Sequence, residues 1–499
     1  MKKFYLTTPL YYVNASPHIG HSYTTIAADS LARYLRRVLG DENVWFLTGT
    51  DEHGQKIQRA AEELKLTPQE FSDKTVLLFK DLWKALDISY NDFIRTTEER
   101  HISVVQQVLN ILYAKGDIYE DKYEGWYCTP CETFWSDAQA AGQLCPDCKR
   151  RVERISERNY FFRLSKYQGW LMEYIKTHPD FIKPASRYEE MSRFLELNTL
   201  TDLCVSRPQE RLSWGIPLPF SKDHVTYVWF DALINYISAV GTFDEKGNYK
   251  SSWWPADLHL IGKDILRQHT IYWPIILRAL NIELPKTVFA HGWWLLGEDK
   301  MSKSRGNVVS PLAMVEKFGI DVYRYFLLRD VPFGLDGNFS EEAIIKRFNG
   351  DLANDLGNLI YRTLTMVEKY YGSNVPERGG EVSPQEKQIR SMMQGLDSPA
   401  QSHLGLKGPD ADYNFSAVLE GIWELINRAN KYVEETKPWN LAKENKADEL
   451  RSFIRLLVDV IRDLSERIGP FMPQTASSIK AQIGSDKVKK GSPLFPRIE

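Results

Sequence analysis

The first fifty residues alternate short apolar runs with a longer segment that has the apolar spacing of a helix. Residues 4–8 form a strand-like run, and residues 24–39 carry apolar side chains four or five positions apart from Ile26 onward. Gly40 follows, where a helix commonly ends. A second strand-like run covers residues 44–48. The pattern predicts a strand–helix–strand unit of a parallel sheet.

Later segments extend this sheet and are followed by a purely helical region. Further strands are expected at 225–230, 258–261 and 288–291, with a helix at 231–240. From about residue 341 the apolar residues recur at a spacing near 3.6, which predicts an α-helical bundle. Its helices are expected at 351–371, 384–396, 417–436 and 446–469, and residues 493–497 are expected to pack back onto the body.

These patterns predict an α/β fold, a parallel sheet with an insertion, followed by a C-terminal α-helical bundle. The first half of the sheet domain is expected at 1–116, the insertion at 117–201 and the second half at 202–290. A loop region that carries two lysines is expected at 291–340, and the bundle at 341–499.

Length and charge narrow the class of protein. A chain of 499 residues is long enough for two to four domains. The net charge of −3 does not point to nucleic acid, so an RNA site would need local basic patches. The start of the chain does not resemble a signal peptide, and no run of eighteen apolar residues occurs. We therefore expect a cytoplasmic protein without a membrane span.

The first candidate site is the pentapeptide Pro17-His18-Ile19-Gly20-His21, which follows the first predicted strand. Open parallel sheets bind ligands at the carboxyl ends of their strands, and the N–H groups at a helix N-terminus suit phosphate. Gly20 permits a close approach of the backbone. Both imidazoles can donate hydrogen bonds to phosphoryl oxygens. Histidines near a helix start are more often structural, so this motif needs a partner.

The second candidate site follows the second predicted strand, at residues 48–54. Its position places Asp51 beside the histidine loop, where a carboxylate can hold the ammonium group of a substrate. Alternatively, Asp51 caps a helix expected at 55–66. The two roles are compatible.

Two lysines provide the partner for the histidine loop. The sequence Lys300-Met301-Ser302-Lys303-Ser304 lies in a segment flanked by glycine and polar residues. A lysine-rich loop is usually a solvated turn. Opposite a phosphate site, however, Lys300 and Lys303 suit a leaving pyrophosphate, because phosphoryl-type transfer requires neutralisation of spreading negative charge.

Four of the five cysteines form two CxxC pairs, Cys128 with Cys131 and Cys145 with Cys148. Each pair can present two thiolates to one tetrahedral ion, which indicates zinc. Four protein ligands leave no open position, so the predicted metal is structural. The fifth cysteine, Cys204, is expected to be a buried small hydrophobe.

The histidine and lysine motifs together closely resemble the HIGH and KMSKS signatures of class I aminoacyl-tRNA synthetases. Within that superfamily the chain resembles the methionyl family from end to end, most specifically in residues 9–14, 50–54, 214–217, 227–232 and 262–264. The resemblance implies a Rossmann-like catalytic domain that activates L-methionine with ATP and Mg²⁺ and transfers it to tRNA(Met). It also implies a KMSKS and stem-contact region at 291–340.

The resemblance further implies roles for individual residues. The catalytic residues would be His18, His21, Lys300 and Lys303, and the nucleotide would be bound by His18, Gly20, His21, Gly262, Asp264 and Lys303. The methionine pocket would be lined by Leu10, Tyr12, Trp229, Ala232, Leu233, Tyr236, Ile265 and His269, with Asp51 on the amino group. An apolar, aromatic pocket suits a thioether, although Trp229 and Tyr236 taken singly read as ordinary core.

The helical bundle resembles the anticodon-binding domain of that family, with Asn358, Arg362 and Trp439 at its reading positions. Arginine and exposed tryptophan suit splayed single-stranded bases. Alternatively, Asn358 and Arg362 belong to a solvated helix face and Trp439 anchors a helix junction. The short insertion with one four-cysteine knuckle resembles the single-zinc form. The chain ends where the family core ends, so we expect a monomer.

Three other readings remain open at this stage. Another class I synthetase, such as the cysteinyl enzyme, would place its zinc ligands near the pocket rather than in the insertion. A small-molecule nucleotidyltransferase would need neither the cysteine insertion nor the bundle. A tRNA-binding protein without activity would not need both phosphate-binding motifs.

Overall fold

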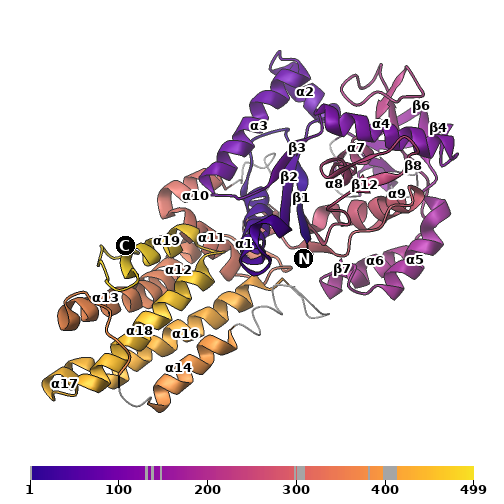
Figure 1. The fold of residues 1–499 in the computed structure, drawn as a ribbon. Coiled ribbons are helices and arrows are strands. Elements are labelled where there is room, and N and C mark those ends of the chain that lie inside the picture. The colour runs from indigo at the N-terminus through magenta and orange to yellow at the C-terminus, as the bar shows by residue number, and fades with distance from the viewer. Residues whose placement is uncertain are drawn as a thin grey trace. The chain divides into compact units, whose positions relative to one another are not determined.

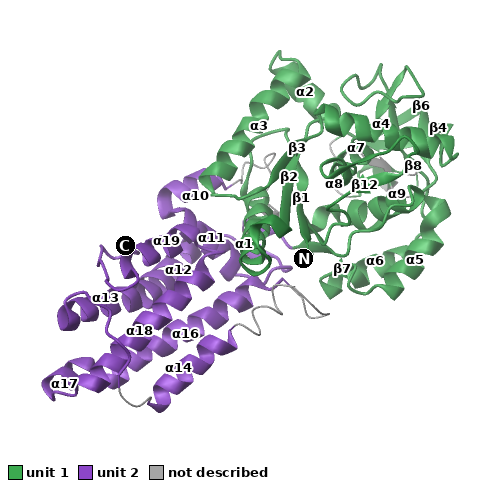
Figure 2. Cartoon of the chain, in the orientation of Figure 1, with its two compact units in different colours: residues 1–291 green, residues 292–499 purple. Residues whose placement is uncertain are grey.

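The computed structural model describes residues 3–129, 133–135, 137, 140–146, 149–296, 299–300, 309–379, 383–396 and 413–498. The chain forms two compact units, residues 1–291 and residues 292–499 (Figure 2). The first unit contains the sheet, and the second contains the helical bundle (Figure 1).

The first unit is organised around a six-stranded sheet with the order β3-β2-β1-β13-β14-β7. Every neighbouring pair in this sheet is parallel. The strands are β1 (Phe4–Tyr12), β2 (Val44–Asp51), β3 (Asp92–Arg95), β7 (Ile182–Lys183), β13 (Leu258–Gly262) and β14 (Val288–His291). The predicted α/β class is confirmed, and the strands predicted at 4–8, 44–48, 258–261 and 288–291 are all present.

The register at the carboxyl ends of β1 and β2 depends on one glycine and one irregularity. The pairing shifts between Thr7 and Leu10, after which Leu10 lies opposite Gly49 and Tyr12 opposite Asp51. A Cβ atom at Gly49 would lie 2.0 Å from the backbone oxygen of Ile94 on β3. Only glycine therefore lets the three strands approach one another at this edge.

The helices of the first unit cover the sheet, and their apolar faces supply most of its core. The α-helices are α1 (Ile19–Leu39), α2 (Gln55–Glu63), α3 (Pro68–Ala85), α4 (Glu99–Ala114), α5 (Gln168–Thr177), α6 (Ala185–Leu197), α7 (Val228–Leu233), α8 (Asn235–Ser238) and α9 (Trp273–Ala279). Between β13 and α9 the chain forms the short 3-10 helix η4 (Lys263–Ile265) and the π-helix η5 (Gln268–Tyr272).

The insertion contributes three strands to a separate antiparallel sheet with the order β5-β4-β6-β8, and the fourth, β8, follows the insertion directly. Its strands are β4 (Ile118–Cys128), β5 (Thr133–Trp135), β6 (Glu153–Phe162) and β8 (Leu203–Cys204). The strands β4 and β6 pair over ten residues, from Ile118 opposite Phe162 to Tyr127 opposite Glu153. Two further hairpin pairs are β9 (Ser206–Pro208) with β10 (His224–Thr226) and β11 (Gly241–Phe243) with β12 (Tyr249–Ser251).

The strand predicted at 225–230 is wrong. Strand β10 stops at Thr226, pairs antiparallel with β9 and lies outside the main sheet, and helix α7 begins at Val228. A short apolar run is compatible with a strand or with a buried helix, and here the buried helix forms. The sequence pattern also missed β3, which has only two apolar residues, and β7, a two-residue strand that joins the main sheet from within 117–201.

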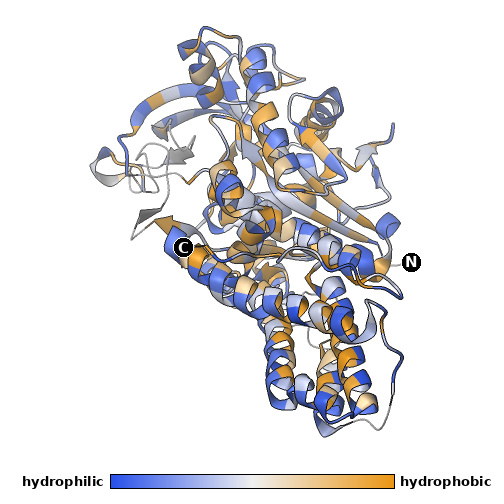
Figure 3. Cartoon of the chain, turned by 90° about the vertical axis from the view of Figure 1, so that its left-hand side faces the viewer, coloured by the Kyte–Doolittle hydropathy of each residue, from blue (hydrophilic) through white to orange (hydrophobic). Residues whose placement is uncertain are grey.

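The second unit begins with short strands and continues as the predicted bundle. The strands are β15 (Trp294–Leu296), β16 (Asp299–Lys300) and β17 (Gly337–Asn338). The helices are α10 (Pro311–Phe318), α11 (Ile320–Arg329), α12 (Glu341–Arg347), η7 (Phe348–Gly357), α13 (Asn358–Tyr371), α14 (Pro384–Gly395), α16 (Phe415–Thr436), α17 (Pro438–Lys443), α18 (Ala447–Ile468) and α19 (Pro473–Ile483). Hydrophobic and hydrophilic residues alternate around these helices (Figure 3), as expected for a bundle.

The predicted packing of the C-terminal segment is confirmed. The ring of Phe495 lies edge-to-face against Phe348, with 5.9 Å between centroids. The side chain of Asn349 exchanges two hydrogen bonds with the backbone of Ile498, at 2.8 and 3.0 Å. No helix in the described part of the chain combines the length and apolarity needed to cross a bilayer.

Candidate active site

The N-terminus of α1 is capped by its own two histidines. His18 is the N-cap residue in extended backbone, and its Nδ1 accepts the N–H of Gly20 at 3.1 Å. The Nδ1 of His21 accepts the N–H of His18 at 3.0 Å. The two rings stack with 3.9 Å between centroids. This reciprocal arrangement is a capping box in which imidazoles take the place of the usual oxygen acceptors.

The capping bonds determine which ring nitrogen carries the proton. Because Nδ1 accepts in both rings, each neutral imidazole has its proton on Nε2. Two N–H donors are thereby added to a helix end that already favours anions. A Cβ atom at Gly20 would lie only 3.0 Å from Cε1 of His18, so a side chain at this position would crowd the ring.

Aromatic residues of β1 and α3 also contact His21. Tyr11 meets His21 edge-to-face with 5.1 Å between centroids, and Phe79 does so at 5.5 Å. The hydroxyl of Tyr11 lies 2.6 Å from Oγ1 of Thr25. Burial raises the pKa of Tyr11, so the phenol remains neutral beside the histidine pair. The position of His21 is therefore fixed by packing as well as by the cap.

His291 connects the same helix end to the neighbouring strand, a role that the sequence did not reveal. Its Nε2 lies 2.6 Å from Oγ1 of Thr24, which also donates to the backbone oxygen of Gly20 at 3.1 Å. His291 ends β14 directly opposite Gly262. At Gly262 a Cβ atom would lie 2.6 Å from Oδ1 of Asp264. The predicted nucleotide residues Gly262 and Asp264 therefore lie at the strand edge that His291 joins to α1.

Asp51 ends β2 opposite Tyr12 and is 8% exposed. The alternative that Asp51 caps the following helix is wrong, because the N-cap of α2 is Gly54, without a side-chain capping bond. The ring of Tyr12 has the ammonium of Lys56 5.2 Å from its centroid. The carboxylate of Asp51 thus lies at the carboxyl edge of the sheet, as predicted.

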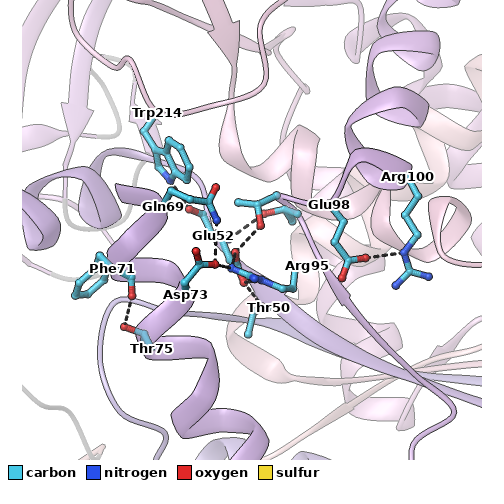
Figure 4. A network of polar contacts seen from close by, with 12 residues as sticks. Thr50, Glu52, Gln69, Phe71, Asp73, Thr75, Arg95, Glu98, Arg100 and Trp214 are labelled. Carbon is cyan, nitrogen blue, oxygen red and sulfur yellow. Dashed lines mark hydrogen bonds and ion pairs between the residues drawn. The ribbon is translucent and has the colours of Figure 1, made fainter. Parts of the chain in front are cut away.

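The residue after Asp51 anchors the end of its strand (Figure 4). Glu52 is fully buried, and its carboxylate accepts two hydrogen bonds from Arg95 of β3, each at 2.8 Å. The hydroxyls of Thr50 and Thr97 donate to the same carboxylate at 2.6 and 2.7 Å. The indole N–H of Trp214 donates to the backbone oxygen of Glu52. A bidentate, fully hydrogen-bonded pair of this kind is geometrically specific.

The next residue, His53, belongs to a second buried network. Its Nδ1 lies 2.7 Å from Oδ2 of Asp231 on α7, and Nε2 of His101 on α4 lies 2.7 Å from Oδ1. The other ring nitrogen of His101 lies 2.8 Å from Oγ of Ser238 on α8. Burial alone would raise the pKa of Asp231, but the two histidines outweigh it and hold the pKa below its ordinary value of 3.8.

In the predicted methionine pocket, the hydrogen-bond partners of His269 also determine which of its ring nitrogens carries the proton. Nδ1 of His269 lies 2.9 Å from the backbone oxygen of Ile265, which can only accept. The proton of the neutral ring is therefore on Nδ1, and Nε2 accepts from the hydroxyl of Tyr236 at 2.7 Å. Burial lowers the pKa of His269 from 6.5 to about 4. His269 is thus a neutral acceptor at physiological pH.

His259, which the sequence did not single out, supports Tyr236 from behind. Its ring lies against that of Tyr236 with 4.2 Å between centroids. The indole of Trp273 donates to its Nε2 at 3.2 Å, and its Nδ1 lies 2.7 Å from Oγ1 of Thr7. Burial and the neighbouring His269 lower the pKa of His259 well below 6.5. The sequence signal that could have identified His259 is a histidine at the centre of an apolar strand.

The other predicted pocket residues lie on the same elements. Leu233 and Tyr236 belong to the core cluster against which Leu10 and Ile265 pack. Trp229, which is half-buried, and Ala232, which is 7% exposed, lie on α7 beside Asp231. The structure thus brings together predicted residues from β1, α7, α8, η4 and η5.

The two described cysteines of the CxxC pairs lie in one small cluster. Cys128 and Cys145 are fully buried together with Trp135, Ala140 and Val152. A tight turn follows Cys145, whose N–H donates to Arg150 O at 2.8 Å and whose oxygen accepts from Lys149 N–H at 2.9 Å. Cys131 and Cys148 lie outside the described residues. Within the described residues no group of three or more metal-binding side chains is present.

The isolated cysteine behaves as predicted. Cys204 is buried, and burial raises the pKa of its thiol to about 12. A thiol with so high a pKa is not a nucleophile at neutral pH.

The predicted lysine loop is described only in part. Lys300 pairs with Leu295 in the antiparallel β15–β16 hairpin, and Lys303 lies outside the described residues. This hairpin lies within the region predicted at 291–340 to carry the lysines.

The predicted anticodon residues lie on two helices of the second unit. Asn358 is the first residue of α13, and Arg362 follows one turn later, with both side chains half-buried. Trp439 lies on α17 and is 45% exposed. All fourteen tryptophans lie in the described part of the chain, and Trp439 is the exposed one. Such exposure favours a binding surface over the alternative of a buried helix-junction anchor.

Comparison with known proteins identifies the family. Residues 4–155 and 151–364 match the family of tRNA synthetases class I (M). The methionine–tRNA ligase of Caldanaerobacter subterraneus is 49% identical over 517 residues, covering 100% of this chain and 79% of the relative. The chain belongs to the methionyl-tRNA synthetase family. The methionine–tRNA ligase of Clostridium perfringens is also 49% identical, over 100% of the chain and 78% of the relative.

Solved methionyl-tRNA synthetases share the fold. The enzyme of Mycobacterium tuberculosis in complex with methionyl-adenylate is 38% identical, covers 100% of both chains and superposes with a TM-score of 0.92. The free form of the same enzyme is 36% identical, with a TM-score of 0.85 and coverage of 100% of this chain and 99% of that one.

Proposed function

We propose that the chain is an ATP-dependent methionine–tRNA ligase. The carboxylate of L-methionine attacks the α-phosphate of ATP, pyrophosphate leaves, and methionine passes from the adenylate to the 3′ end of tRNA(Met). One observation carries this proposal. The histidine-capped N-terminus of α1 lies at the carboxyl edge of a parallel sheet whose next strand ends in Asp51, in a chain 49% identical to relatives with this name.

The histidine pair acts on the phosphoryl group. Charge develops on the oxygens of the α-phosphate as the carboxylate attacks, and the Nε2–H groups of His18 and His21 supply hydrogen-bond donors at the helix end. Because the capping bonds fix both rings before the substrate binds, these donors need no reorganisation. Gly20, Gly262 and Asp264 supply the rest of the nucleotide site.

The loop lysines Lys300 and Lys303 neutralise the departing pyrophosphate, which Mg²⁺ accompanies as part of the nucleotide substrate. This assignment rests on the KMSKS sequence, and Lys303 belongs to residues that the structure does not describe.

The pocket residues bind methionine at both ends. Asp51 pairs with the ammonium group, and Leu10, Tyr12, Trp229, Ala232, Leu233, Tyr236, Ile265 and His269 surround the thioether. A neutral His269 suits this task, because burying a charged imidazole beside an apolar side chain would cost free energy.

The remaining parts of the chain have separate roles. Residues 1–116 and 202–290 form the catalytic domain, 117–201 the insertion, 291–340 the KMSKS and stem-contact region, and 341–499 the anticodon-binding domain. Asn358, Arg362 and Trp439 read the anticodon. Replacing Trp439 with Ala should lower aminoacylation about tenfold to a hundredfold, since base–aromatic stacking is worth about 1–3 kcal/mol. Methionine activation without tRNA should not change. Equal losses in both reactions with a lower Tm would show a structural role instead.

The insertion holds one structural zinc ion through Cys128, Cys131, Cys145 and Cys148. The burial of Cys128 and Cys145 in one cluster, with a tight turn after Cys145, fits two converging CxxC pairs. Bound zinc would supply folding energy to the insertion and take no part in the reaction. Metal analysis of protein purified without chelators should find one zinc per chain, and Cys145→Ser should lose it while the main sheet remains folded.

Amino-acid-dependent ATP–pyrophosphate exchange tests the proposed function. The purified chain should support exchange with methionine and not with the other nineteen amino acids. Exchange with cysteine alone would favour the cysteinyl alternative. If tRNA stimulates the formation of no product, the result would favour a small-molecule nucleotidyltransferase. We also propose that the protein acts in the cytoplasm and that it is a monomer. Light scattering of the purified chain tests the monomeric state.

A further inference from the structure

The buried network of His53, Asp231 and His101 lies outside the residues assigned so far, yet it lies between parts of the pocket. His53 follows Asp51 by two residues at the end of β2. Asp231 lies on α7 directly before Ala232, and its carboxylate is fully buried between the two histidine rings. Ser238, which contacts His101, follows Tyr236 by two residues.

We infer that His53, His101 and Asp231 are positioning residues that join the two walls of the methionine pocket. One wall is the end of β2, where Asp51 meets the ammonium group. The other wall is formed by α7 and α8, which carry side chains around the thioether. This inference rests on the proposed function and adds to it a set of residues that do not contact the substrate.

The geometry makes the connection rigid and directional. Each oxygen of Asp231 has its own imidazole donor, His53 from the β2 wall and His101 from α4, both at 2.7 Å. A carboxylate without exposed surface must keep such partners, because an uncompensated charge in the core is strongly unfavourable. Helix α7 therefore cannot move away from β2 without breaking a bond to a buried charge.

Contacts with Trp214 also hold His53 and the residue that follows it in place. The ring of Trp214 lies 5.3 Å from that of His53, and Gly54 N–H donates to Trp214 O at 3.2 Å. With Glu52 held by Arg95, the two residues after Asp51 are anchored to two different neighbours, β3 and α7. The network thereby fixes the separation between the ammonium site and the thioether site.

The two histidines offer matched substitutions, because each donates through a different ring nitrogen. An Asn side chain places an N–H near the position of Nδ1, so His53→Asn keeps the donor to Asp231, whereas His53→Leu removes it. A Gln side chain places an N–H near the position of Nε2, so His101→Gln keeps the other donor and His101→Leu removes it. Neither amide titrates.

Methionine-dependent pyrophosphate exchange by the full chain tests the inference. Both Leu variants should raise KM for methionine about tenfold, with KM for ATP within about twofold of wild type. Both amide variants should remain within about threefold of wild type in both constants. Thermal unfolding is measured for each protein. Unchanged methionine KM in the folded Leu variants, or an equal rise in both KM values, would overturn the inference.

A milder variant decides the question if the Leu variants do not fold. Ser238→Ala removes the partner of His101 Nδ1 and leaves both donors to Asp231 in place, so KM for methionine should rise about threefold and KM for ATP should not. Unchanged constants in Ser238→Ala would then overturn the inference. Measuring wild-type protein in parallel distinguishes failure of the inference from failure of the proposed function. Failure of wild type to exchange with methionine would overturn the proposed function itself, whereas wild-type exchange with unaffected variants overturns only the inference.

Discussion

Two of the histidine pairs in the first unit use the same side chain in opposite ways. His18 and His21 are half-buried at the start of α1, with Nδ1 accepting backbone N–H groups and Nε2 carrying the proton. His259 and His269 are buried beside Tyr236, and His269 Nε2 accepts from that phenol. The first pair offers donors to a ligand, and the second pair accepts from the protein.

The difference arises from burial and from the partner of one nitrogen. A backbone N–H at Nδ1, as in His18 and His21, leaves an outward donor at Nε2, whereas a backbone carbonyl at Nδ1, as in His269, leaves an inward acceptor at Nε2. Burial then lowers the pKa of His259 and His269, so the second pair stays neutral. We expect the first pair to act on the transition state and the second pair on methionine binding.

The largest expected effect comes from removing the outward donors while keeping the cap. In His18→Asn and His21→Asn the amide oxygen lies near the position of Nδ1 and can accept in its place, and at position 18 Asn is also a good N-cap residue. No donor remains at Nε2. Loss of one preorganised donor should lower kcat for pyrophosphate exchange about 100-fold to 1,000-fold. KM for methionine should stay within about twofold.

The matched substitution is His18→Gln, because at position 21, the third residue of the helix, Gln is itself a capping-box acceptor. His18→Gln retains a donor near Nε2 and loses the capping acceptor, so it should keep more activity than His18→Asn and lower Tm instead. Higher activity of His18→Asn than of His18→Gln would show that capping, not donation, is what His18 provides.

The second effect is on the pH dependence of stability. Folded His269 stays neutral down to a pKa of about 4, whereas the unfolded side chain titrates near 6.5. Between these values the unfolded state binds more protons, so the free energy of unfolding falls as the pH falls. The stability that neutral His269 contributes is fully present above about pH 6.5. At pH 5 the free energy of unfolding is lower by about 2 kcal/mol for this reason.

His269→Gln removes this titration while its amide oxygen can still accept from Tyr236. Denaturant unfolding at pH 7 and pH 5 should therefore show a smaller pH dependence in the variant than in wild type. His259 contributes in the same direction and remains in both proteins. An identical pH dependence would contradict the neutral, buried state of His269.

A tenfold effect is expected on methionine binding. His269→Leu leaves the buried hydroxyl of Tyr236 without its acceptor, which costs about 1–3 kcal/mol. KM for methionine should rise about tenfold with kcat within about threefold. His269→Gln is the control and should lie near wild type. A fall in kcat without a change in KM would place His269 with the outward pair.

The smallest effect is expected at Gly20, where stability and activity should change in opposite directions. Ala in place of Gly within a helix stabilises by about 1 kcal/mol. The added Cβ, however, would lie 3.0 Å from Cε1 of His18 and displace its ring. Gly20→Ala should therefore raise Tm slightly and lower kcat about threefold to tenfold. A rise in both quantities would show that the orientation of His18 is not critical.

The sequence predicted the parts of the fold in which apolar residues form a long periodic pattern or a continuous run. The bundle helices predicted at 351–371, 384–396, 417–436 and 446–469 and the strands β1, β2, β13 and β14 are long or strongly apolar enough to be found, whereas the shorter helices α17 and α19 were not predicted. Strand β3 has two apolar residues between Asp92 and Arg95, and β7 has two residues in total. Such strands exist because neighbouring strands supply their hydrogen bonds, which a local pattern does not contain.

The candidate site was predictable where residues share a motif and less so where they meet only in space. The sequence singled out Asp51 but not Glu52 and His53, although all three lie at the end of one buried strand. Their partners Arg95 and Asp231 lie 43 and 178 positions away in the sequence. A charged residue in an apolar run, such as Asp231, was the signal, and the folded structure was needed to identify its partners.

Equilibrium binding of methionine in the absence of ATP most directly tests the division of roles between the two histidine pairs. Calorimetry would compare wild type, the His18→Asn/His21→Asn double variant and His269→Leu. The outward pair acts only on the reacting phosphate, so the double variant should bind methionine within about twofold of wild type, whereas His269→Leu should bind about tenfold more weakly. Loss of methionine affinity in the double variant equal to that in His269→Leu would contradict the account.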